Sequence, residues 1–138
     1  MSTIAARILD RLDQLLKANV PLGTQVFRDR ADAVTRQETP CINVVARSDA
    51  IESFSAETDK HELLIELRIN VRDAVPTPLA EAQLEGVHGP IVTDSELKSL
   101  CESVRLVNAT FEPEEADQTS LIKTAQYRFT YLIPQVNL

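Results

Sequence analysis

Aromatic residues are scarce in this chain of 138 residues, and tryptophan is absent. At 4% of the sequence, they are too few for a platform that stacks nucleic-acid bases or sugar rings. The core is therefore predicted to be aliphatic and built from leucine, isoleucine and valine. Long hydrophobic runs are also missing, because no run approaches the roughly 20 apolar residues that a membrane-spanning helix needs. The two absences argue against a base-stacking surface and against a membrane span.

Glycine and cysteine are equally rare. Three glycines, at positions 23, 86 and 89, do not form the glycine-rich loop that holds a phosphate before a helix. Cys41 and Cys101 lack the Cys-x-x-Cys spacing of a redox pair, so buried thiols are expected and a disulfide is the less favoured alternative. The segment Ser2–Lys17 mixes charged and apolar residues, unlike a secretory signal. The chain is thus expected to stay in the cytoplasm of its host cell.

Catalytic and metal-binding patterns are missing as well. His61 and His88 are the only histidines, and no nucleophile-elbow or cysteine-protease signature accompanies them. A Ser/His or Cys/His pair formed in space stays open, but both histidines are interpreted as packing or surface residues. Structural zinc would need four clustered ligands, and the acidic run Glu112–Asp117 lacks the spacing and central glycine of an EF-hand. We therefore predict no enzyme, no cofactor and no metal site.

Acidic residues outnumber basic ones, and the formal net charge is -7. This charge argues against nucleic acid as the main partner, because phosphates are repelled. Arginines nevertheless lie around the segment after Pro40 and on polar strand faces: Arg28, Arg30, Arg36, Arg47, Arg68, Arg72 and Arg128. Ordinary surface charge is the simpler interpretation. The alternative is that they meet the acidic segments Glu52–Asp59 and Glu112–Asp117 of a neighbouring copy, in head-to-tail contacts that can close into a ring.

The clearest pattern that is present is an alternation of apolar and polar residues from His61 to Asp73. Its odd positions are apolar: Leu63, Ile65, Leu67, Ile69 and Val71. Most of its even positions are polar: Glu62, Glu66, Arg68, Asn70 and Arg72. A period of two predicts a long β-strand with one dry and one wet face, in a largely antiparallel sheet.

Two main helices and a short third turn are predicted. Thr3–Ala18 has apolar residues at helical spacing, and Asn19 is expected to end it in a left-handed conformation. The second helix is expected to start with Thr77 as its cap, and Gly89-Pro90 should kink it or end it early. Its inward stripe is predicted as Leu79, Ala82, Gln83, Val87 and Ile91. Asp94 can cap the third turn.

Further strands are expected at residues 25–28, 41–46, 104–111 and 121–133. The acidic segment Ser48–Lys60 is interpreted as a surface loop or a pair of frayed strand extensions, and alternatively as an interaction loop that orders on assembly. Residues 1–138 are thus predicted to form one α+β domain. It should contain a mixed, mostly antiparallel sheet of four to five strands with two main helices packed on one face.

The order of these elements resembles the tail terminator, or minor tail protein U-like, family of long-tailed bacteriophages. The resemblance covers nearly the whole chain and is one of order and pattern. The segments that carry it are Val26-Phe27-Arg28, Glu38-Thr39-Pro40, Glu62–Arg72, Val87-His88, Asp94 with Leu97 and Leu100, Val104–Phe111, Glu112-Pro113-Glu114-Glu115 and Tyr127–Tyr131.

The resemblance implies a structural protein of a phage or prophage, without catalysis. Such proteins form a ring, usually a hexamer, at the head-proximal end of the tail tube, stop tube polymerisation and provide the surface that the head joins. The implied partners are further copies of the chain, the tail tube protein and a head-completion protein, with no nucleic acid as main partner and no membrane. The implied location is the host cytoplasm during assembly and then the virion tail.

Two kinds of surface are expected to carry this assembly. One is the segment Ser48–Lys60. The other is a set of charged residues: Arg28, Arg30, Glu66, Arg68, Arg72, Glu114 and Glu115. A head–tail completion or connector protein is an alternative function, and a small-molecule-binding or enzymatic α+β domain is a less favoured one.

Overall fold

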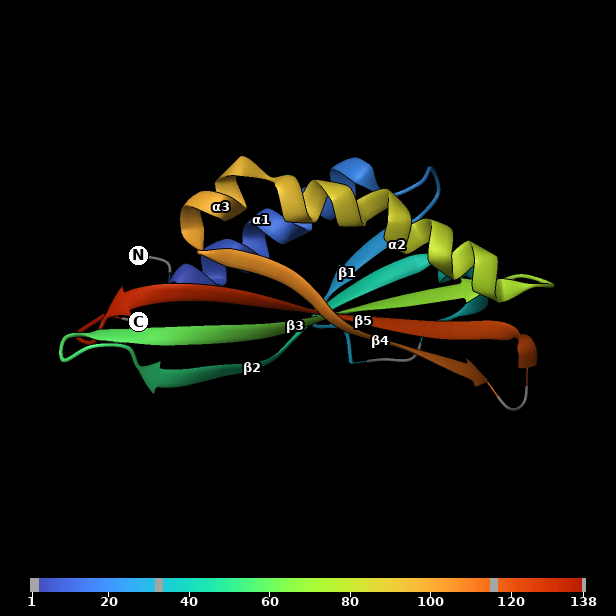
Figure 1. Cartoon of the computed structure of the whole chain (residues 1–138). Coiled ribbons are helices and arrows are strands. Elements are labelled where there is room, and N and C mark those ends of the chain that lie inside the picture. The colour runs from blue at the N-terminus through green and yellow to red at the C-terminus, as the bar shows by residue number, and fades with distance from the viewer. Residues whose placement is uncertain (1–2, 32–33, 115–116, 138) are drawn as a thin grey trace.

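In a computed structural model, the chain forms one five-stranded sheet whose three α-helices lie on the same face (Figure 1). The structure describes residues 3–31, 34–114 and 117–137. Its elements in chain order are α1 (Ile4–Asn19), β1 (Gln25–Arg28), the 3-10 helix η1 (Arg36–Glu38), β2 (Cys41–Ser53), β3 (Thr58–Arg72), α2 (Pro76–Thr93), α3 (Ser95–Leu100), β4 (Ser103–Glu114) and β5 (Asp117–Pro134). The predicted α+β class, with a mixed and mostly antiparallel sheet, is confirmed.

The strand order is β1-β2-β3-β5-β4, and among the described strands only the β1–β2 pair is parallel. The short strand β1 pairs with β2 from Cys41 to Val44. Within the residues that the structure describes, β2 beyond Val44 pairs on one side only, with β3, and β4 at the opposite side of the sheet pairs only with β5. The sheet thus has two long open edges, one on β2 and one on β4.

The predicted alternation of β3 is confirmed. Leu63 is 3% exposed, and the other odd-numbered residues up to Val71 are fully buried under the helices. The segment Ser48–Lys60 forms strand extensions, since β2 continues to Ser53 and β3 begins at Thr58. A tight hairpin joins them, with the amide N of Phe54 3.0 Å from the carbonyl oxygen of Thr58. Of the interpretations offered for this segment, the strand extensions are correct.

The core is less purely aliphatic than predicted. Leucine, isoleucine and valine fill most of it, but the largest fully buried side chains include Tyr127, Phe129 and Tyr131. All three lie on the helix-covered face of β5, because alternate residues of a strand point to the same side. Half of the chain's six aromatic residues are therefore concentrated in one central strand.

Helix α1 begins as predicted, with the side chain of Thr3 accepting a hydrogen bond from the amide N of Ala6 at 3.1 Å. The left-handed end predicted for Asn19 is wrong. Asn19 is still helical and its Nδ2 donates to the carbonyl oxygen of Leu15 at 2.8 Å, while the extended residue Val20 ends the helix. The amide side chain thus satisfies one of the last carbonyl groups, which otherwise lack a partner inside the helix.

Helix α2 corrects two predictions about its start and its buried face. It begins at Pro76 with Val75 at the cap position, so Thr77 is not the cap. Prolines suit the first turn, whose N–H groups have no partner inside the helix. The predicted inward residue Ala82 is exposed and Ala80 is buried instead, because Ala80 shares a helix face with the buried residues Gln83, Leu84 and Val87.

The helix α2 also continues through Pro90 to Thr93 and does not end early. An interior proline costs about 3 kcal/mol. Val87, three residues before Pro90, and Ile91, directly after it, are each 1% exposed, and burying each side chain contributes roughly 2 kcal/mol. Packing on the sheet therefore outweighs the local cost of the proline. Within the described ranges, no helix combines the length and apolar character that a membrane crossing requires.

Candidate functional site

One face of the sheet carries no α-helix (Figure 1). The segment between β1 and β2 covers part of it, because the side chain of Asn43 on this face bonds the backbone of Arg30. We call it the helix-free face, and it contains the even-numbered residues of β3 from Lys60 to Arg72. The strand pairing places Arg68 of β3 beside Asn43 of β2 and Thr124 of β5 on this face. The predicted wet side of β3 is therefore the centre of a broad polar surface made by four strands.

Glu66 organises the middle of the helix-free face although it is only 8% exposed. Its Oε1 lies 3.2 Å from Nη2 of Arg68 and 3.5 Å from Nε of Arg47. Its Oε2 accepts a hydrogen bond from Nε2 of Gln126 at 3.0 Å. Beside this cluster is an open hollow of about 410 Å³ that Glu112 also lines. One carboxylate thus holds two arginines from adjacent strands.

Replacing Glu66 by alanine is expected to lower the free energy of unfolding by about 1–2 kcal/mol. The loss stays modest because the side chains of Arg47 and Arg68 are 51% and 39% exposed, so water screens their charges. Glu66→Gln keeps the shape and an acceptor for Gln126 and should lose less than about 1 kcal/mol. Urea unfolding of both variants measures the difference, and equal losses would show that the carboxylate charge, and not the retained shape and hydrogen bond, accounts for the whole effect.

Arg28 and Arg30 lie away from the Glu66 cluster, at the β1 edge of the sheet. Nη2 of Arg30 lies 2.7 Å from Oε1 of Glu38, and its guanidinium carbon is 4.6 Å above the Phe27 ring. The hydrogen bond from Arg30 holds the pKa of Glu38 at about 2, well below its usual range. Arg28 pairs with Asp10 of α1 at 2.6 Å. Both arginines therefore have partners within their own chain.

Arg72 and Glu114 both line a second hollow of about 380 Å³, together with Thr39 and Ser120. This hollow shares Glu112 with the first one, so the two lie along the same side of the sheet. Glu115 lies outside the described residues. The predicted set of charged residues thus separates into the β1 edge and a continuous strip on the helix-free face.

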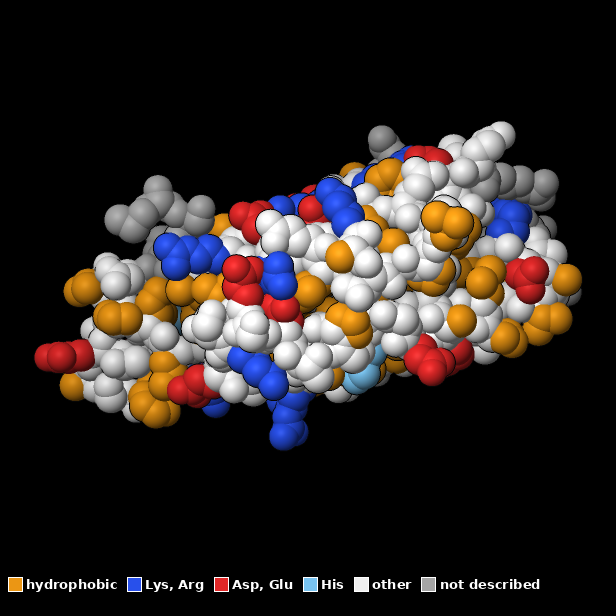
Figure 2. Space-filling view, turned by 90° about the horizontal axis from the view of Figure 1, so that it is seen from above, with side chains coloured by type: hydrophobic (Ala, Val, Ile, Leu, Met, Phe, Trp, Pro, Cys, Tyr) orange, Lys and Arg blue, Asp and Glu red, His pale blue; other side chains and the backbone are white. Residues whose placement is uncertain are grey.

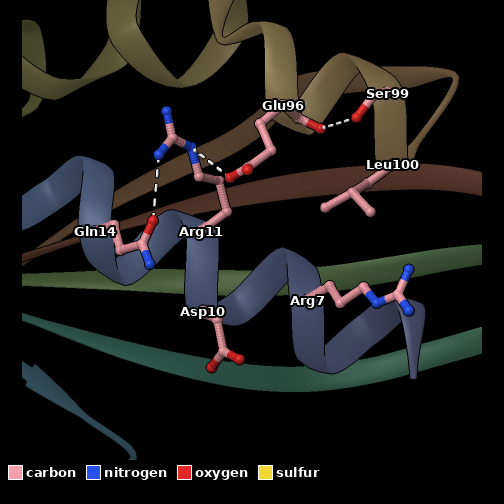
Figure 3. A pocket seen from close by; sticks show the side chains of 7 residues that line it. All are labelled: Arg7, Asp10, Arg11, Gln14, Glu96, Ser99 and Leu100. Atoms are coloured by element: carbon pink, nitrogen blue, oxygen red, sulfur yellow. Dashed lines mark hydrogen bonds and ion pairs between the residues drawn. The ribbon is translucent and has the colours of Figure 1, made fainter. Parts of the chain in front are cut away.

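On the opposite side of the molecule, α1 and α3 border an open groove of about 380 Å³ (Figure 3). Arg11 extends across it from α1. Its Nη1 donates to Oε1 of Gln14 at 3.2 Å, and its Nε lies 3.0 Å from Oε2 of Glu96. Leu100 is the one apolar side chain that lines it. The groove was not predicted, because its two walls are far apart in the sequence.

Asp94 connects this groove to the start of α3. Its Oδ1 lies 2.8 Å from Nη2 of Arg11, and its Oδ2 accepts from the amide N of Leu97 at 3.0 Å, which confirms the predicted cap. The hydrogen bond from Arg11 is the main reason that the pKa of Asp94 lies below its ordinary value of 3.8. The charged form of Asp94 therefore favours the folded state.

Asp94→Ala is expected to lower the free energy of unfolding at about pH 6 by about 1–2 kcal/mol, mostly through the lost cap. Because the folded pKa is depressed, this stabilisation is present above the unfolded pKa and is lost as the pH falls through the folded pKa. The gap between wild type and variant should thus narrow below about pH 4 in urea unfolding. Asp94→Asn keeps a side-chain oxygen that can cap the helix but removes the negative charge, so its difference from wild type measures the contribution of the charge. A gap that does not change with pH would contradict the Arg11–Asp94 pairing.

The two histidines are packing residues on the helix-covered side. His61 is 3% exposed, and its ring stacks on Tyr131 with centroids 4.8 Å apart. Nδ1 of His61 and the hydroxyl of Tyr131 lie 3.0 Å and 2.9 Å from the same Oδ2 of Asp49. His88 contacts the hydroxyl of Tyr127 at 2.7 Å. Burial is the main cause that raises the pKa of both tyrosines.

The two cysteines are free and buried, as predicted. Sγ of Cys101 donates to the carbonyl oxygen of Leu97 at 3.0 Å. Burial raises the pKa of both thiols to about 11, so they are protonated and unreactive at neutral pH.

Lys123 is a buried charge that the sequence analysis missed. It is 3% exposed on the helix-covered face of β5, where it binds Glu81 of α2 and lies 4.7 Å from the centre of the Phe111 ring. Its burial could have been predicted from its odd-numbered position, because the neighbouring odd-numbered residues Leu121 and Ala125 are buried on the same face of β5. Across the described part of the chain, no three histidine, cysteine, aspartate or glutamate side chains are grouped to hold a metal ion.

The surface on the helix side mixes both signs of charge (Figure 2). Acidic and basic side chains lie next to one another there, and hydrophobic side chains are visible at both ends of the molecule. At the β2–β3 hairpin, Ile51 and Phe54 are 56% and 61% exposed. Such a surface suits specific protein contacts more than a polyanion. No protein-family model matches the chain, and no curated protein matches it.

Proposed function

We propose that this protein is a structural subunit of a phage or prophage tail, a tail terminator that assembles into a ring. The ring would cap the head-proximal end of the tail tube, stop its polymerisation and offer a surface to the head. The resemblance in the order of elements supports this proposal. Its partners would be further copies of the chain, the tail tube protein and a head-completion protein.

The observation that carries the proposal is the pair of open sheet edges. They belong to β2 and β4, on opposite sides of one sheet, and they differ in sequence. An unpaired strand is a ready surface for another strand. Two different surfaces on opposite sides favour head-to-tail contacts, and such contacts close into a ring when the rotation between copies allows it.

The helix-free face fits the same role. In a ring joined edge to edge, every copy would present this face to the same side of the wall. Its centre is occupied by the Glu66 cluster and the adjoining hollow, whose lining is largely polar. Paired charges of both signs keep such a face hydrated, so it suits the lining of a ring better than a tightly packed interface.

Light scattering on a sizing column tests ring formation directly. The purified chain is expected to give a defined oligomer whose fraction rises with protein concentration, and electron microscopy should show rings. Addition to polymerising tail tube protein should then shorten the tubes and place a ring at one end. A strict monomer at all concentrations and salt conditions, together with unchanged tube length, would contradict the proposal.

A further inference from the structure

We infer that strand β4 of one copy pairs antiparallel with strand β2 of the next copy, with Arg105–Glu112 lying against Val45–Glu52. This inference rests on the proposed ring and names its joint. It makes the sheets of neighbouring copies continuous, with the helices of all copies on one side of the wall and the helix-free faces on the other.

Both strands are accessible for such pairing. Residues 46–53 of β2 and residues 105–114 of β4 are all exposed. In the part of the chain that the structure describes, β3 is the only strand paired with β2 beyond Val44, and β5 is the only strand paired with β4. Each segment Val45–Glu52 and Arg105–Glu112 spans about 26 Å of strand, so the two match in length.

The strand directions favour this pairing between copies in the same orientation. Three antiparallel steps lead from β2 through β3 and β5 to β4, so β2 and β4 run in opposite directions. When one copy is placed beside the next by a simple rotation, its β4 meets the neighbouring β2 antiparallel. Antiparallel strands need no crossover connection and form the more stable ladder.

The irregularities of the two strands also match. Within the two segments that would meet, β2 has one bulge, between Ala46 and Ser48, and β4 has one, between Leu106 and Asn108. The second irregularity of β4, between Pro113 and Glu114, lies beyond the joint. An extra residue on one strand alone would turn the following side chains to the wrong face. Because each strand carries one, residues on both sides of the bulges stay on matching faces of the combined sheet.

One register satisfies both charge and hydrophobic contacts. With Arg105 opposite Glu52 on the helix-free face, Leu106 lies opposite Ile51 on the helix-covered face. These two apolar side chains are 37% and 56% exposed in the single chain, and the pairing would cover them. At the other end of the joint, Glu112 comes to lie beside Arg47, whose side chain is 51% exposed.

The adjacent register is worse. A shift by two residues, the smallest shift that keeps the faces, sets Leu106 opposite Asp49 and Arg105 opposite Ala50. Both the apolar contact and the opposite-charge contact are then lost. In the favoured register the small residue Ala109 faces Asp49, which leaves room for the bonds of Asp49 to His61 and Tyr131.

Charge reversal on the two edges provides the test. Glu52→Arg and Arg105→Glu each create a like-charge pair at every joint, so each variant alone should weaken assembly by about tenfold or more. A 1:1 mixture of the two variants is different. At a mixed joint the unchanged Arg105 of one variant meets the unchanged Glu52 of the other, or the two substituted side chains meet with opposite charges. The mixture, and the Glu52→Arg/Arg105→Glu double variant, should assemble within about threefold of wild type.

Glu85→Arg and Arg7→Glu are matched controls. Both residues are exposed on helices, on α2 and α1, away from the sheet edges. Neither variant should change the oligomer, and native mass spectrometry should find no preference for a mixed species. Thermal unfolding of each variant confirms that the monomer is folded.

A cross-link supplies a second measurement. The Ile51→Cys/Leu106→Cys double variant should oxidise to covalently linked oligomers, since directly opposed strand residues lie within disulfide reach. Native Cys41 and Cys101 are 0% and 7% exposed and should not compete.

The outcomes separate the joint from the ring. If both charge-reversal variants still form rings and the cysteine variant does not cross-link, the β4–β2 joint is wrong, but the proposed function is not contradicted. A dimer sensitive to Arg105→Glu but not to Glu52→Arg would show pairing of β4 with β4 and overturn the joint as well. Wild-type protein that stays monomeric would overturn both.

Discussion

Phe129→Ala is expected to lower the free energy of unfolding by about 3–5 kcal/mol, the largest effect of any substitution considered for this chain. Phe129 is fully buried on β5, where it is paired with Leu63 of β3 and Val104 of β4. Removing the ring leaves a cavity between the sheet and its helices that a central strand, bonded on both sides, cannot close. Urea unfolding followed by circular dichroism measures the loss.

Phe54→Ala is the matched control for this prediction. The same ring is removed from the tip of the β2–β3 hairpin, where Phe54 is 61% exposed. The expected loss there is within about 0.5 kcal/mol, as for most surface substitutions. Similar losses in the two variants would mean that Phe129 does not anchor the core as its burial indicates.

The parts of the fold that were predictable are those whose side chains alternate between core and water. In β3 the apolar residues from Leu63 to Val71 mark the buried face, and in β5 the residues from Leu121 to Ile133 do the same. Helix α1 was predictable for the same reason, because Ile8, Leu12 and Leu16 lie on one buried stripe. The spacing of apolar residues in the sequence shows directly which side of a strand or helix is buried.

The hairpin arms beyond Ala46 were harder to predict. Residues 46–53 are exposed, so no apolar period marks them as strand. Their structure comes from backbone pairing with β3, which continues to the pair Ser53–Asp59. Backbone hydrogen bonds are the same for every side chain, so the sequence carries little information about how far such a ladder extends.

The candidate site was predictable only as a set of charges. Glu66 and Arg68 do come together, because residues two apart on a strand share a face. Arg30 was predicted to lie at a contact with another copy, and it binds Glu38 of its own chain, eight residues away in the 3-10 helix η1. This pair within the chain does not test the predicted contact. A sequence shows which residues are charged, but the partner of each charge depends on the path of the chain in space. The assignment of these charged residues to an assembly surface stays a prediction.

Asp49→Ala is expected to lower the free energy of unfolding by about 2–4 kcal/mol, although Asp49 lies on an exposed part of β2. Its Oδ2 is the acceptor for the Tyr131 hydroxyl and the neighbour of Nδ1 of His61. Tyr131 and His61 are 2% and 3% exposed, so water cannot easily replace the lost carboxylate. Each buried polar group left without a partner costs about 1–3 kcal/mol.

The Asp49→Asn variant separates hydrogen bonding from charge. The amide oxygen can take the place of Oδ2, where it accepts from the Tyr131 hydroxyl and from Nδ1 of His61, so the loss should stay within about 1 kcal/mol. Urea unfolding at neutral pH compares the two variants. If Asp49→Asn were as destabilising as Asp49→Ala, the negative charge of Asp49 itself would be required. If neither variant were destabilised, the carboxylate would be dispensable, since water would then reach Tyr131 and His61 despite their burial.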